Sequence, residues 1–321
     1  MKNKTVFITG GAGFIGTKIV ERLIDNNKII IFDTLQRNSI KDSNISRHPN
    51  LKIIVGNVLD QKKVVQSIGN ADIVIYLAAI AGIDTVIKSP TTTMNVNYVG
   101  TYNVLEAAKS LFHLDRFIDF STSEVYGSYA YKLDEANPTS MGAVGTARWT
   151  YAISKLAAEH LSHSYYSEFN LPVTSIRPFN IYGPGQVGEG AIHTFIQRAL
   201  NNEEILIHGD GDQVRSWCYV DDIVDAIMLC IENKNAIGEV FNIGNPRGTI
   251  TILSLAEKIV DLCNSGSEIR FVPKPYVDVQ LRIPDIEKSK KILGYAPNVS
   301  LDEGLQRTIE WYIEQRKQTN S

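Results

Sequence analysis

Short apolar runs alternate with longer amphipathic stretches over the first half of this chain. The runs are rich in Val, Ile and Phe, which predicts strands buried on both faces of a sheet. Between them, the stretches at about 91–111 and 151–169 carry apolar residues at helical spacing. The predicted strands are Thr5–Thr9, Lys28–Phe32, Leu51–Val55, Asp72–Tyr76, Phe117–Phe120 and Val173–Ile176.

This alternation predicts an α/β fold with a doubly wound parallel sheet, because parallel strands need helical crossovers between them. The pattern breaks up after Arg177-Pro178, where Gly and Pro cluster over 183–190. We expect a smaller C-terminal α/β part there that binds substrate, whereas the strand at 241–244 and the helix after it return to the sheet. The predicted boundaries are 1–177 with 239–265, and 178–238 with 266–321.

A glycine-rich turn follows the first predicted strand and precedes a helical pattern. Gly10 can adopt the backbone angles of a tight turn, Gly13 lets the main chain approach a pyrophosphate, and Gly16 lets the helix pack closely on the strand. Free N–H groups at the start of the helix would then bind the phosphates. The motif is typical of a dinucleotide-binding Rossmann fold, and a purely structural turn is the alternative.

The second predicted strand leads into Asp33, whose carboxylate is placed to accept hydrogen bonds from an adenosine ribose. A carboxylate there favours NAD over NADP, because it would repel the 2′-phosphate of NADP. Arg37, four residues further on, is the feature that leaves NADP open. NAD is therefore the predicted cofactor.

Composition and charge argue against several classes of protein. With 321 residues and 44% hydrophobic content, the chain can bury one large core or two unequal ones. The net charge of −3 and the lack of a long basic stretch argue against nucleic acid as a partner. No apolar run reaches the roughly 18 residues of a membrane span, and the N-terminus has no signal-peptide pattern.

Cysteine and histidine usage predicts neither disulfides nor a metal site. Cys218, Cys230 and Cys263 lie far apart and form no CxxC pair, so we expect reduced thiols in a cytoplasmic protein. His160 and His163 share a predicted helix, but no further ligand pattern accompanies them, and no metal is expected.

Candidate catalytic residues follow the fifth predicted strand, since ligands of this fold bind beyond the carboxyl ends of the strands. This turn contains Glu124 and Thr122, whose hydroxyl can hydrogen-bond a substrate hydroxyl. Tyr151 and Lys155 are four residues apart and therefore share one helix face. The lysine, with a positive nicotinamide ring, is expected to lower the pKa of the tyrosine so that the phenolate acts as a base. The alternatives are that the hydroxyl turn only caps the strand, that Glu124 is a solvated acid, and that Tyr151 and Lys155 form a surface pair.

Together these motifs resemble an extended short-chain dehydrogenase/reductase of the nucleotide-sugar epimerase, dehydratase and decarboxylase group, over about residues 4–312. One departure is Asn57, where the family usually has an aspartate that faces the adenine. Its carbonyl can still accept from the adenine amino group. Further matches are Leu77-Ala78-Ala79, Asn97, Gly100-Thr101, Arg177–Pro184, Gly209-Asp210-Gly211, Arg215 and Arg282–Ile286.

The resemblance implies the contacts of cofactor and substrate residue by residue. Thr122, Glu124, Tyr151 and Lys155 would be catalytic, and the last two would also contact NAD. The other implied cofactor contacts are Gly10, Gly13, Phe14, Ile15, Gly16, Asp33, Asn57, Val58, Leu77, Ala78 and Ala79. The implied substrate contacts are Ser123, Asn180, Arg215 and Arg282. Guanidinium groups suit a pyrophosphate, and surface salt bridges are the alternative for both arginines.

Within the family, the branch most resembled is that of the UDP-glucuronate decarboxylases. The segments that carry this likeness are Ser121–Gly127, Arg148–Tyr151, Phe241–Pro246 and Arg282–Ile286. It implies transient oxidation of C4 by NAD, with Tyr151 taking the hydroxyl proton. The 4-keto acid then loses carbon dioxide, because the ketone stores the electrons as an enolate, and NADH reduces the ketone. Glu124 and Arg282 would orient the sugar.

Two other chemistries of the family stay open. A 4,6-dehydratase usually has Asp where Ser123 stands. A 4-epimerase needs no carboxylate at position 124, and the stretch at 79–83 resembles that of the epimerases. Uronate epimerases commonly have an arginine where Asp84 stands, and an acid that faces a uronate would be unfavourable. A non-catalytic NAD-binding regulator and a one-way reductase are further alternatives on the same fold.

The implied partners are a nucleotide sugar, with a UDP-sugar favoured, and a second copy of the chain. The helices at about 91–111 and 151–169 would pair with their copies in a homodimer, as in the family.

Overall fold

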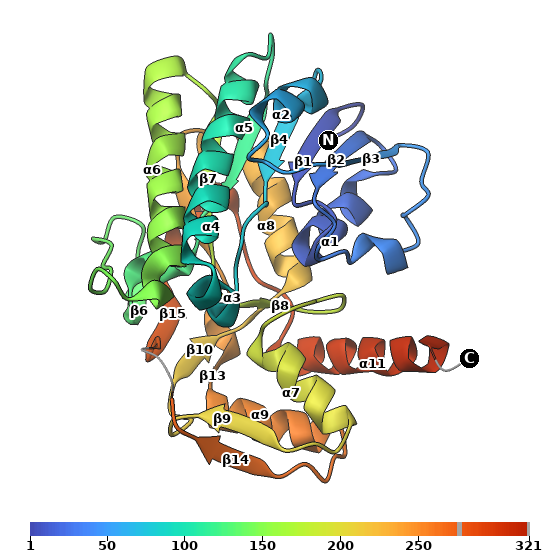
Figure 1. Cartoon of the computed structure of the whole chain (residues 1–321), viewed down its shortest axis with the longest axis vertical. Helices are drawn as coiled ribbons and strands as arrows, with labels where there is room; N and C mark the ends of the chain where they lie inside the picture. The colour runs from blue at the N-terminus through green and yellow to red at the C-terminus, as the bar shows by residue number, and fades with distance from the viewer. Residues whose placement is uncertain (275–277, 320–321) are drawn as a thin grey trace.

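Within residues 1–274 and 278–319, which the computed structural model describes, seven parallel strands form one large sheet (Figure 1). They are β1 (Thr5–Thr9), β2 (Lys28–Asp33), β3 (Leu51–Val55), β4 (Ile73–Tyr76), β5 (Arg116–Phe120), β7 (Val173–Pro178) and β12 (Val240–Ile243). Their spatial order, β12-β7-β5-β4-β1-β2-β3, reverses direction between β1 and β4. The predicted doubly wound sheet is therefore confirmed, and its switch point is the expected ligand-binding crevice.

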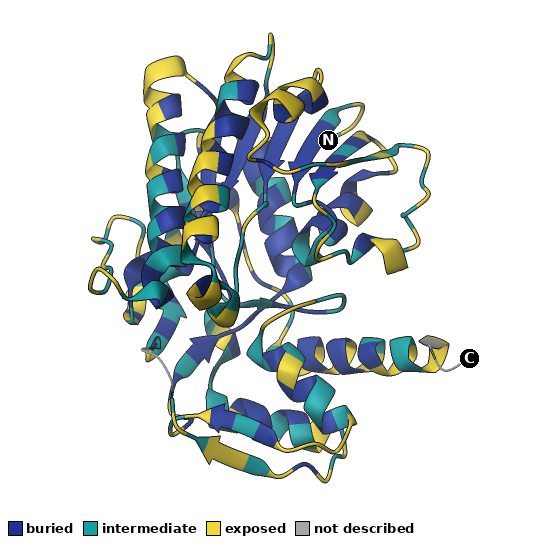
Figure 2. Ribbon diagram, viewed as in Figure 1, coloured by how far each residue is buried: buried dark blue, intermediate teal, exposed yellow. Residues whose placement is uncertain are grey.

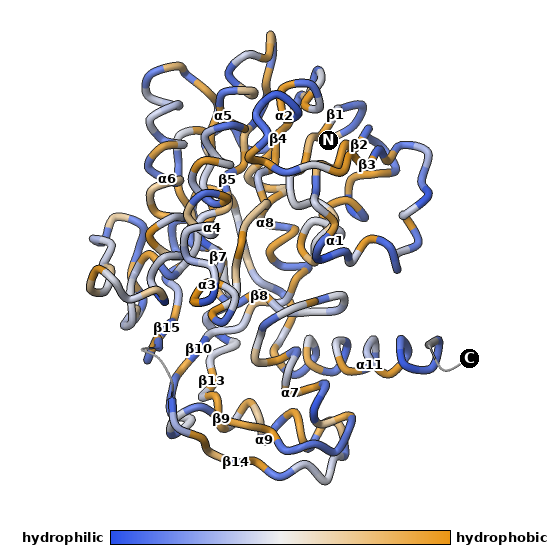
Figure 3. The backbone as a smooth tube through the Cα atoms, in the orientation of Figure 1, coloured by the Kyte–Doolittle hydropathy of each residue, from blue (hydrophilic) through white to orange (hydrophobic). Residues whose placement is uncertain are grey.

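Helices cover both faces of this sheet. They are α1 (Phe14–Leu23), α2 (Gln61–Ile68), α4 (Pro90–Met94), α5 (Gly100–Lys109), α6 (Thr150–Phe169) and α8 (Val220–Glu232). On β1, Val6 and Ile8 belong to the core under α1 and α8, whereas Phe7 belongs to the core under α2 and α5. All three are fully buried, which explains the nearly continuous apolar runs. Figure 2 shows the strands buried between helices with exposed outer faces, and Figure 3 shows the same strands as hydrophobic.

The stretch predicted as one helix at about 91–111 is interrupted. α4 passes into a π-helical segment, η2 (Asn95–Val99), before α5 begins. A π turn is a rare insertion of one residue into a helix and is frequent at functional sites. The second predicted long helix forms without interruption as α6.

The smaller part lies below the large sheet in Figure 1. In the described ranges, its strands form one sheet in the order β13-β10-β15-β6 and the pairs β11-β8 and β14-β9. These strands are β6 (Tyr129–Leu133), β8 (Ile181–Tyr182), β9 (Ile205–His208), β10 (Val214–Ser216), β11 (Cys218–Tyr219), β13 (Thr249–Thr251), β14 (Ile269–Val272) and β15 (Leu281–Pro284). The remaining α-helices are α3 (Ile83–Lys88), α7 (Ala191–Leu200), α9 (Ile252–Leu262), α10 (Glu287–Leu293) and α11 (Leu301–Thr319).

The domain boundaries stay a prediction, and two strands and two helices are placed differently from it. β6 and β13 lie in the ranges predicted for the large part but pair with β15 and β10 of the smaller part. β12 lies beside β7, as expected, but the helix that follows, α9, packs on α7 and β9 of the smaller part through its buried residues Leu255, Ala256 and Ile259. α8 lies within 178–238, yet it packs on α1 and β5. Residues 275–277 and 320–321 of the predicted smaller part are outside the described ranges. No helix in the described ranges is both long and apolar enough to span a bilayer.

Candidate active site

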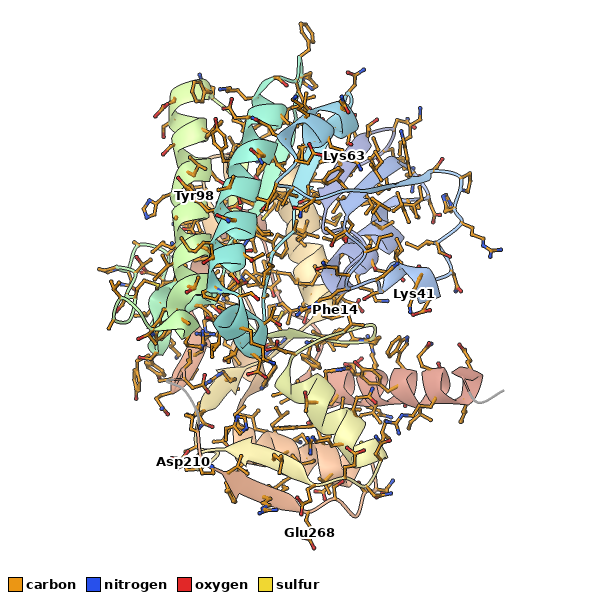
Figure 4. All side chains as sticks on the ribbon, in the orientation of Figure 1. Phe14, Lys41, Lys63, Tyr98, Asp210 and Glu268 are labelled. Atoms are coloured by element: carbon orange, nitrogen blue, oxygen red, sulfur yellow. The ribbon has the colours of Figure 1, made fainter. Side chains whose placement is uncertain are left out.

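A cavity of about 320 Å³ lies at the carboxyl ends of β1, β2 and β4, at the switch point of the sheet. Eight predicted cofactor contacts line it: Gly10, Gly13, Asp33, Asn57, Val58, Leu77, Ala78 and Ala79. Phe14, Ile15 and Gly16 form the first turn of α1 beside it. Phe14 lies where the large sheet meets the smaller part (Figure 4). The first turn of α1 therefore borders the crevice, as the glycine motif predicts.

Two glycines of the turn are required by close contacts. Gly10 has φ of +69°, and a Cβ there would lie 2.7 Å from the backbone nitrogen of Ala78. A Cβ on Gly16 would lie 2.6 Å from the Cα of Gly11. Any larger residue would push β4, or the start of α1, away from β1.

Asp33 and Asn57 both use side-chain oxygens to shape the loops around the cavity. Asp33 accepts the N–H of Ala12 at 3.0 Å and that of Leu35 at 2.8 Å, and each oxygen keeps a further lone pair for a ribose hydroxyl. Burial raises the pKa of Asp33 and outweighs these hydrogen bonds. Asn57 accepts the N–H of Leu59 at 3.0 Å, and its carbonyl likewise keeps a lone pair.

Arg37, the residue that left NADP open, lines the cavity and already has a hydrogen-bond partner there. Its Nη2 donates to the carbonyl of Ala81 at 3.1 Å, and its guanidinium packs against Gly188. Sequence reasoning missed other residues that line the cavity. They are Phe32, Thr34, Gln36, Gly56, Ile80, Thr85, Thr92 and Val96. The signal for Thr34, Gln36 and Gly56 was their position at the end of a predicted strand; Thr92 and Val96 gave no such signal.

Tyr151 stands at the start of α6, against the hydroxyl turn that follows β5. Thr122 accepts the N–H of Glu124 at 3.2 Å, and its hydroxyl favours the ionised form of the Tyr151 phenol. Burial and the charge of Glu124 raise the pKa of Tyr151 to about 12. The expectation that Lys155 lowers this pKa is therefore not met in the protein alone. The cations that act on the phenol are Arg282 and Arg148, which oppose the rise without overcoming it.

Lys155 lies one turn further along α6 and is only 2% exposed. Its Nζ has no hydrogen-bond partner among the described residues and lies 5.6 Å from the ring centroid of Tyr76. A buried ammonium without a partner is costly unless a ligand supplies acceptors. The hydroxyls of a nicotinamide ribose are suitable acceptors, so this side chain fits a dinucleotide beside Tyr151.

Asn97 connects the cavity to the catalytic helix. It lies in the π-helical η2, is fully buried, and exchanges hydrogen bonds with the backbone of Ile80 at 2.8 and 3.1 Å. Its Nδ2 also lies 3.0 Å from the hydroxyl of Ser154, next to Lys155. The loop after β4 and the start of α6 are thus held by one side chain.

Glu124 is not a solvated acid but the centre of an arginine cluster. Arg148 donates to its two carboxylate oxygens at 2.6 and 3.3 Å, and Arg282 lies at 3.5 Å. Burial favours the protonated carboxyl, but the guanidiniums of Arg282 and Arg148 outweigh it and hold the pKa of Glu124 below its usual value. In the sequence, Arg148 is recognisable only as part of a motif, and that motif predicted no role for it.

Arg215 and Arg282 are register partners on the adjacent strands β10 and β15, and both are buried. The alternative of surface salt bridges is therefore wrong. Arg215 donates to the carbonyl of Val279 at 2.6 Å and faces Asp278 at 3.4 Å, and burial lowers its pKa to about 10. Within the described residues, Nε and Nη2 of Arg282 are buried without a partner. These donors are available to an anionic ligand.

The other two predicted substrate contacts, Asn180 and Ser123, are less available to bind a substrate. Asn180 has φ of +39° and donates to the carbonyl of Ser216 at 2.8 Å, so its amide already fixes the start of β8. Ser123 is 2% exposed in the turn η3 (Ser123–Tyr126). Direct contact of either side chain with a substrate stays a prediction.

One group of possible metal ligands lies far from this site. Asp72, His113 and Asp115 approach one another at the amino ends of β4 and β5. Lys4 places its ammonium 2.7 Å from Asp115 and 3.7 Å from Asp72. That cation already compensates the carboxylates, so the cluster is an ion-pair network.

Comparison with known proteins decides the family. The profile of the NAD dependent epimerase/dehydratase family matches residues 6–244. The chain belongs to this family. A UDP-N-acetyl-alpha-D-glucosaminuronate decarboxylase of Bacillus cytotoxicus is 36% identical over 97% of this chain and 98% of its own. A dTDP-D-glucose 4,6-dehydratase of Bos taurus is 35% identical over 97% and 89%. These family members perform different reactions.

A solved family member carries the cofactor. The structure of UDP-glucuronic acid 4-epimerase from Bacillus cereus, in complex with UDP-glucuronic acid and NAD, superimposes with a TM-score of 0.88 at 29% identity. The superposition covers 97% of this chain and 99% of the epimerase. The predicted NAD cofactor and the predicted family are therefore confirmed. This chain belongs to a family of nucleotide-sugar enzymes that work with NAD.

Removal of the Asp33 charge is expected to change the cofactor preference of this family member. Asp33→Asn should weaken NAD binding about tenfold, because a charge-assisted hydrogen bond to the ribose is lost, and should strengthen NADP binding. Titration calorimetry with both dinucleotides measures the two changes. Asp42→Asn, at an exposed aspartate of the short helix η1 (Ile40–Asp42), is the control and should change neither affinity. Equal loss of NAD and NADP affinity would contradict the role in discrimination.

Proposed function

We propose that this chain is a decarboxylase of a UDP-hexuronate, which it oxidises transiently at C4. The substrate class is UDP-glucuronate or its 2-acetamido counterpart. The observation that carries the proposal is the pair of buried donors on Arg282 that have no partner among the described residues, beside the Glu124–Arg148 pair. A guanidinium with free donors suits the carboxylate of a uronate, because planar N–H pairs match planar oxygen pairs. The similarity to a glucosaminuronate decarboxylase supports the same substrate class.

Two further observations favour decarboxylation. Ser123 stands where the resembled dehydratases have an acid, and a serine hydroxyl is a poor proton donor to a leaving C6 hydroxyl. Asp84, which we expected to face a uronate unfavourably, is exposed in the first turn of α3, and its side chain does not line the cavity. Its backbone N–H donates to Glu189 at 2.9 Å. The exposure of Asp84 weakens the electrostatic objection to a uronate.

Each catalytic side chain then has one task. NAD, when bound, accepts the C4 hydride and later returns it. Tyr151 takes the proton of the C4 hydroxyl, and the Thr122 hydroxyl beside it hydrogen-bonds the same substrate hydroxyl. Lys155 holds the ribose, and Arg282 and Arg148 orient the carboxylate. The C5–carboxylate bond breaks and carbon dioxide leaves. The electron pair of that bond passes into the 4-keto group, and a proton then adds at C5.

Product analysis tests this function. The purified protein is incubated with NAD and with UDP-glucuronate, its 2-acetamido analogue or neutral UDP- and dTDP-hexoses, and products are followed by mass spectrometry and proton NMR. We expect loss of carbon dioxide from a UDP-hexuronate. Loss of water from a neutral hexose would make the chain a dehydratase. Unchanged mass with an inverted C4 signal would make it a 4-epimerase, the second candidate, which the epimerase-like stretch at 79–83 favours.

The same preparation distinguishes the remaining alternatives. An enzyme that recycles its cofactor within each turnover should purify with NAD bound, whereas a one-way reductase would release oxidised cofactor. Ultraviolet absorbance of the supernatant after denaturation measures the bound dinucleotide. Bound NAD with no change of any sugar would favour a non-catalytic NAD-binding regulator.

We also propose that the chain forms a homodimer through α5 and α6. These two helices pack on each other and leave aromatic side chains exposed on their outer faces. The exposed side chains are Tyr102 on α5 and Tyr166 and Phe169 on α6, together with Tyr98 on η2, which leads into α5. Figure 4 shows Tyr98 on the outer helical layer. Apolar faces of this kind are typical of an interface, and light scattering measures the oligomeric state. The cytoplasmic location stays a proposal, supported by three free cysteines.

A further inference from the structure

The catalytic helix buries a polar stripe against the sheet. Lys155, Glu159 and Ser162 recur at helical spacing along α6 and are 2%, 5% and 0% exposed. The buried face of a helix is ordinarily apolar, because unpaired polar groups lose their hydration there. The stripe therefore needs partners in the layer on which it packs.

Asp119 lies on that layer, one residue before the end of the buried strand β5. Its register partners are Tyr76 on β4 and Ser175 on β7, so the three side chains point to the same face of the sheet. The hydroxyl of Ser175 donates to Asp119 Oδ2 at 3.2 Å. Its other oxygen, Oδ1, is buried with no hydrogen-bond partner in the part of the chain that the structure describes. Lys155 lies over the ring of Tyr76.

The charge of Glu159 is already matched. Its two oxygens accept from Nη2 and Nε of Arg177 at 2.6 and 3.0 Å, and Nη1 of Arg177 lies 2.7 Å from the hydroxyl of Tyr126. The charges of Glu159 and Arg177 therefore cancel within this ion pair. In the described part of the layer, the Asp119 carboxylate is therefore left as the countercharge for Lys155, which has no hydrogen-bond partner of its own.

We propose that Asp119 is a positioning residue whose carboxylate is the buried countercharge that keeps Lys155 protonated and in place beside Tyr151. This inference rests on the proposed catalytic role of Lys155. Burial lowers the pKa of Lys155, and the charge of Asp119 opposes that fall. Burial also raises the pKa of Asp119 to about 6, which the charge of Lys155 limits. The charge of Glu159 opposes the fall in the pKa of Lys155 less than that of Asp119 does, and Tyr76 is the other titratable group that interacts with Asp119 in the described residues.

A double-mutant cycle in thermal stability tests the pairing without any turnover. Asp119→Asn alone should lower Tm, because it leaves a buried ammonium without a countercharge. In a Lys155→Met background the same change should raise Tm, because there it removes a buried carboxylate that has lost its partner. The direction of the Tm change in the Lys155→Met background decides whether Asp119 and Lys155 are paired, even where Asp119→Asn alone is too unstable to purify. A fall in Tm in that background would overturn the proposal.

The pH profile of turnover tests the effect on catalysis, with whichever nucleotide sugar the protein converts. Loss of the countercharge makes Lys155 release its proton more easily, so the basic limb of kcat in Asp119→Asn should move down by about one pH unit or more. A merely structural role would lower stability and leave this limb in place, and an unmoved limb would overturn the catalytic part of the proposal.

Asp222→Asn is the matched control for both experiments. Asp222 is also a buried aspartate, but it lies on α8 and accepts backbone N–H groups of Asn298 and Val299. Its substitution should lower Tm equally in the wild-type and Lys155→Met backgrounds and leave the basic limb unmoved. If no sugar is turned over, the proposed function fails while the stability cycle still decides whether Asp119 and Lys155 are paired.

Discussion

Tyr151→Phe is expected to lower kcat by about two to four orders of magnitude while NAD binding is largely retained, because the substitution removes one hydroxyl that acts as the base. The phenol is the only group changed, and Thr122 keeps its hydrogen bond to the backbone of Glu124. Steady-state kinetics on the converted sugar and fluorescence titration with NAD measure the two quantities. Retained turnover would contradict the assignment of Tyr151 as the base.

Tyr165→Phe is the matched control for that experiment. Tyr165 lies near the opposite end of the same helix, α6, and its hydroxyl donates to Glu106. The same atom is deleted from the same helix, but far from the site, so kcat should not change. A drop in kcat in both variants would point to a general disturbance of α6.

Glu124→Gln should combine a large loss of activity with a large loss of stability. The change leaves Arg148 and Arg282 buried without a carboxylate between them, and removal of one partner from a buried ion pair costs about 3 kcal/mol. Urea unfolding measures this difference in the free energy of unfolding. Glu303→Gln, in an exposed pair with Arg307, is the control and should cost less than about 0.5 kcal/mol. A similar small loss in Glu124→Gln would mean that the cluster contributes little to folding.

The stability difference between wild type and Glu124→Gln should depend on pH in one direction. The folded-state pKa of Glu124 is held below its unfolded value, so its contribution is complete above the usual carboxyl range near pH 4.5. The difference should therefore be constant from about pH 6 to pH 8 and shrink as the pH falls through the folded-state pKa. A difference that grows on acidification would contradict the ion-pair explanation.

Local patterns were sufficient for the features that depend on neighbours in sequence. The glycine turn, Asp33, and the hydroxyl turn after β5 each follow a strand, and a parallel sheet brings the ends of its strands to one edge. The spacing of Tyr151 and Lys155 likewise places both on one helix face. Their positions in the structure agree with these expectations.

The features that sequence reasoning missed depend on contacts between distant segments. Arg148 reaches Glu124 across a segment of more than twenty residues that includes β6, and no periodicity reports such a contact. The raised pKa of Tyr151 depends on burial and on the charge of Glu124. α9 was assigned to the large sheet because it follows a sheet strand, whereas its apolar face determined where it packs.

The π turn at η2 makes the site sensitive to the number of residues in a helix as well as to their identity. One residue less between Asn95 and Val99 would restore an ordinary α-helix, and everything on one side of the deletion would rotate by about 100° around the helix axis. Asn97 would then turn away from Ile80 and Ser154, or α5 would turn its buried face outward. A single-residue deletion in η2 would thus uncouple the cofactor loop from the catalytic helix, although every catalytic side chain would remain in the sequence.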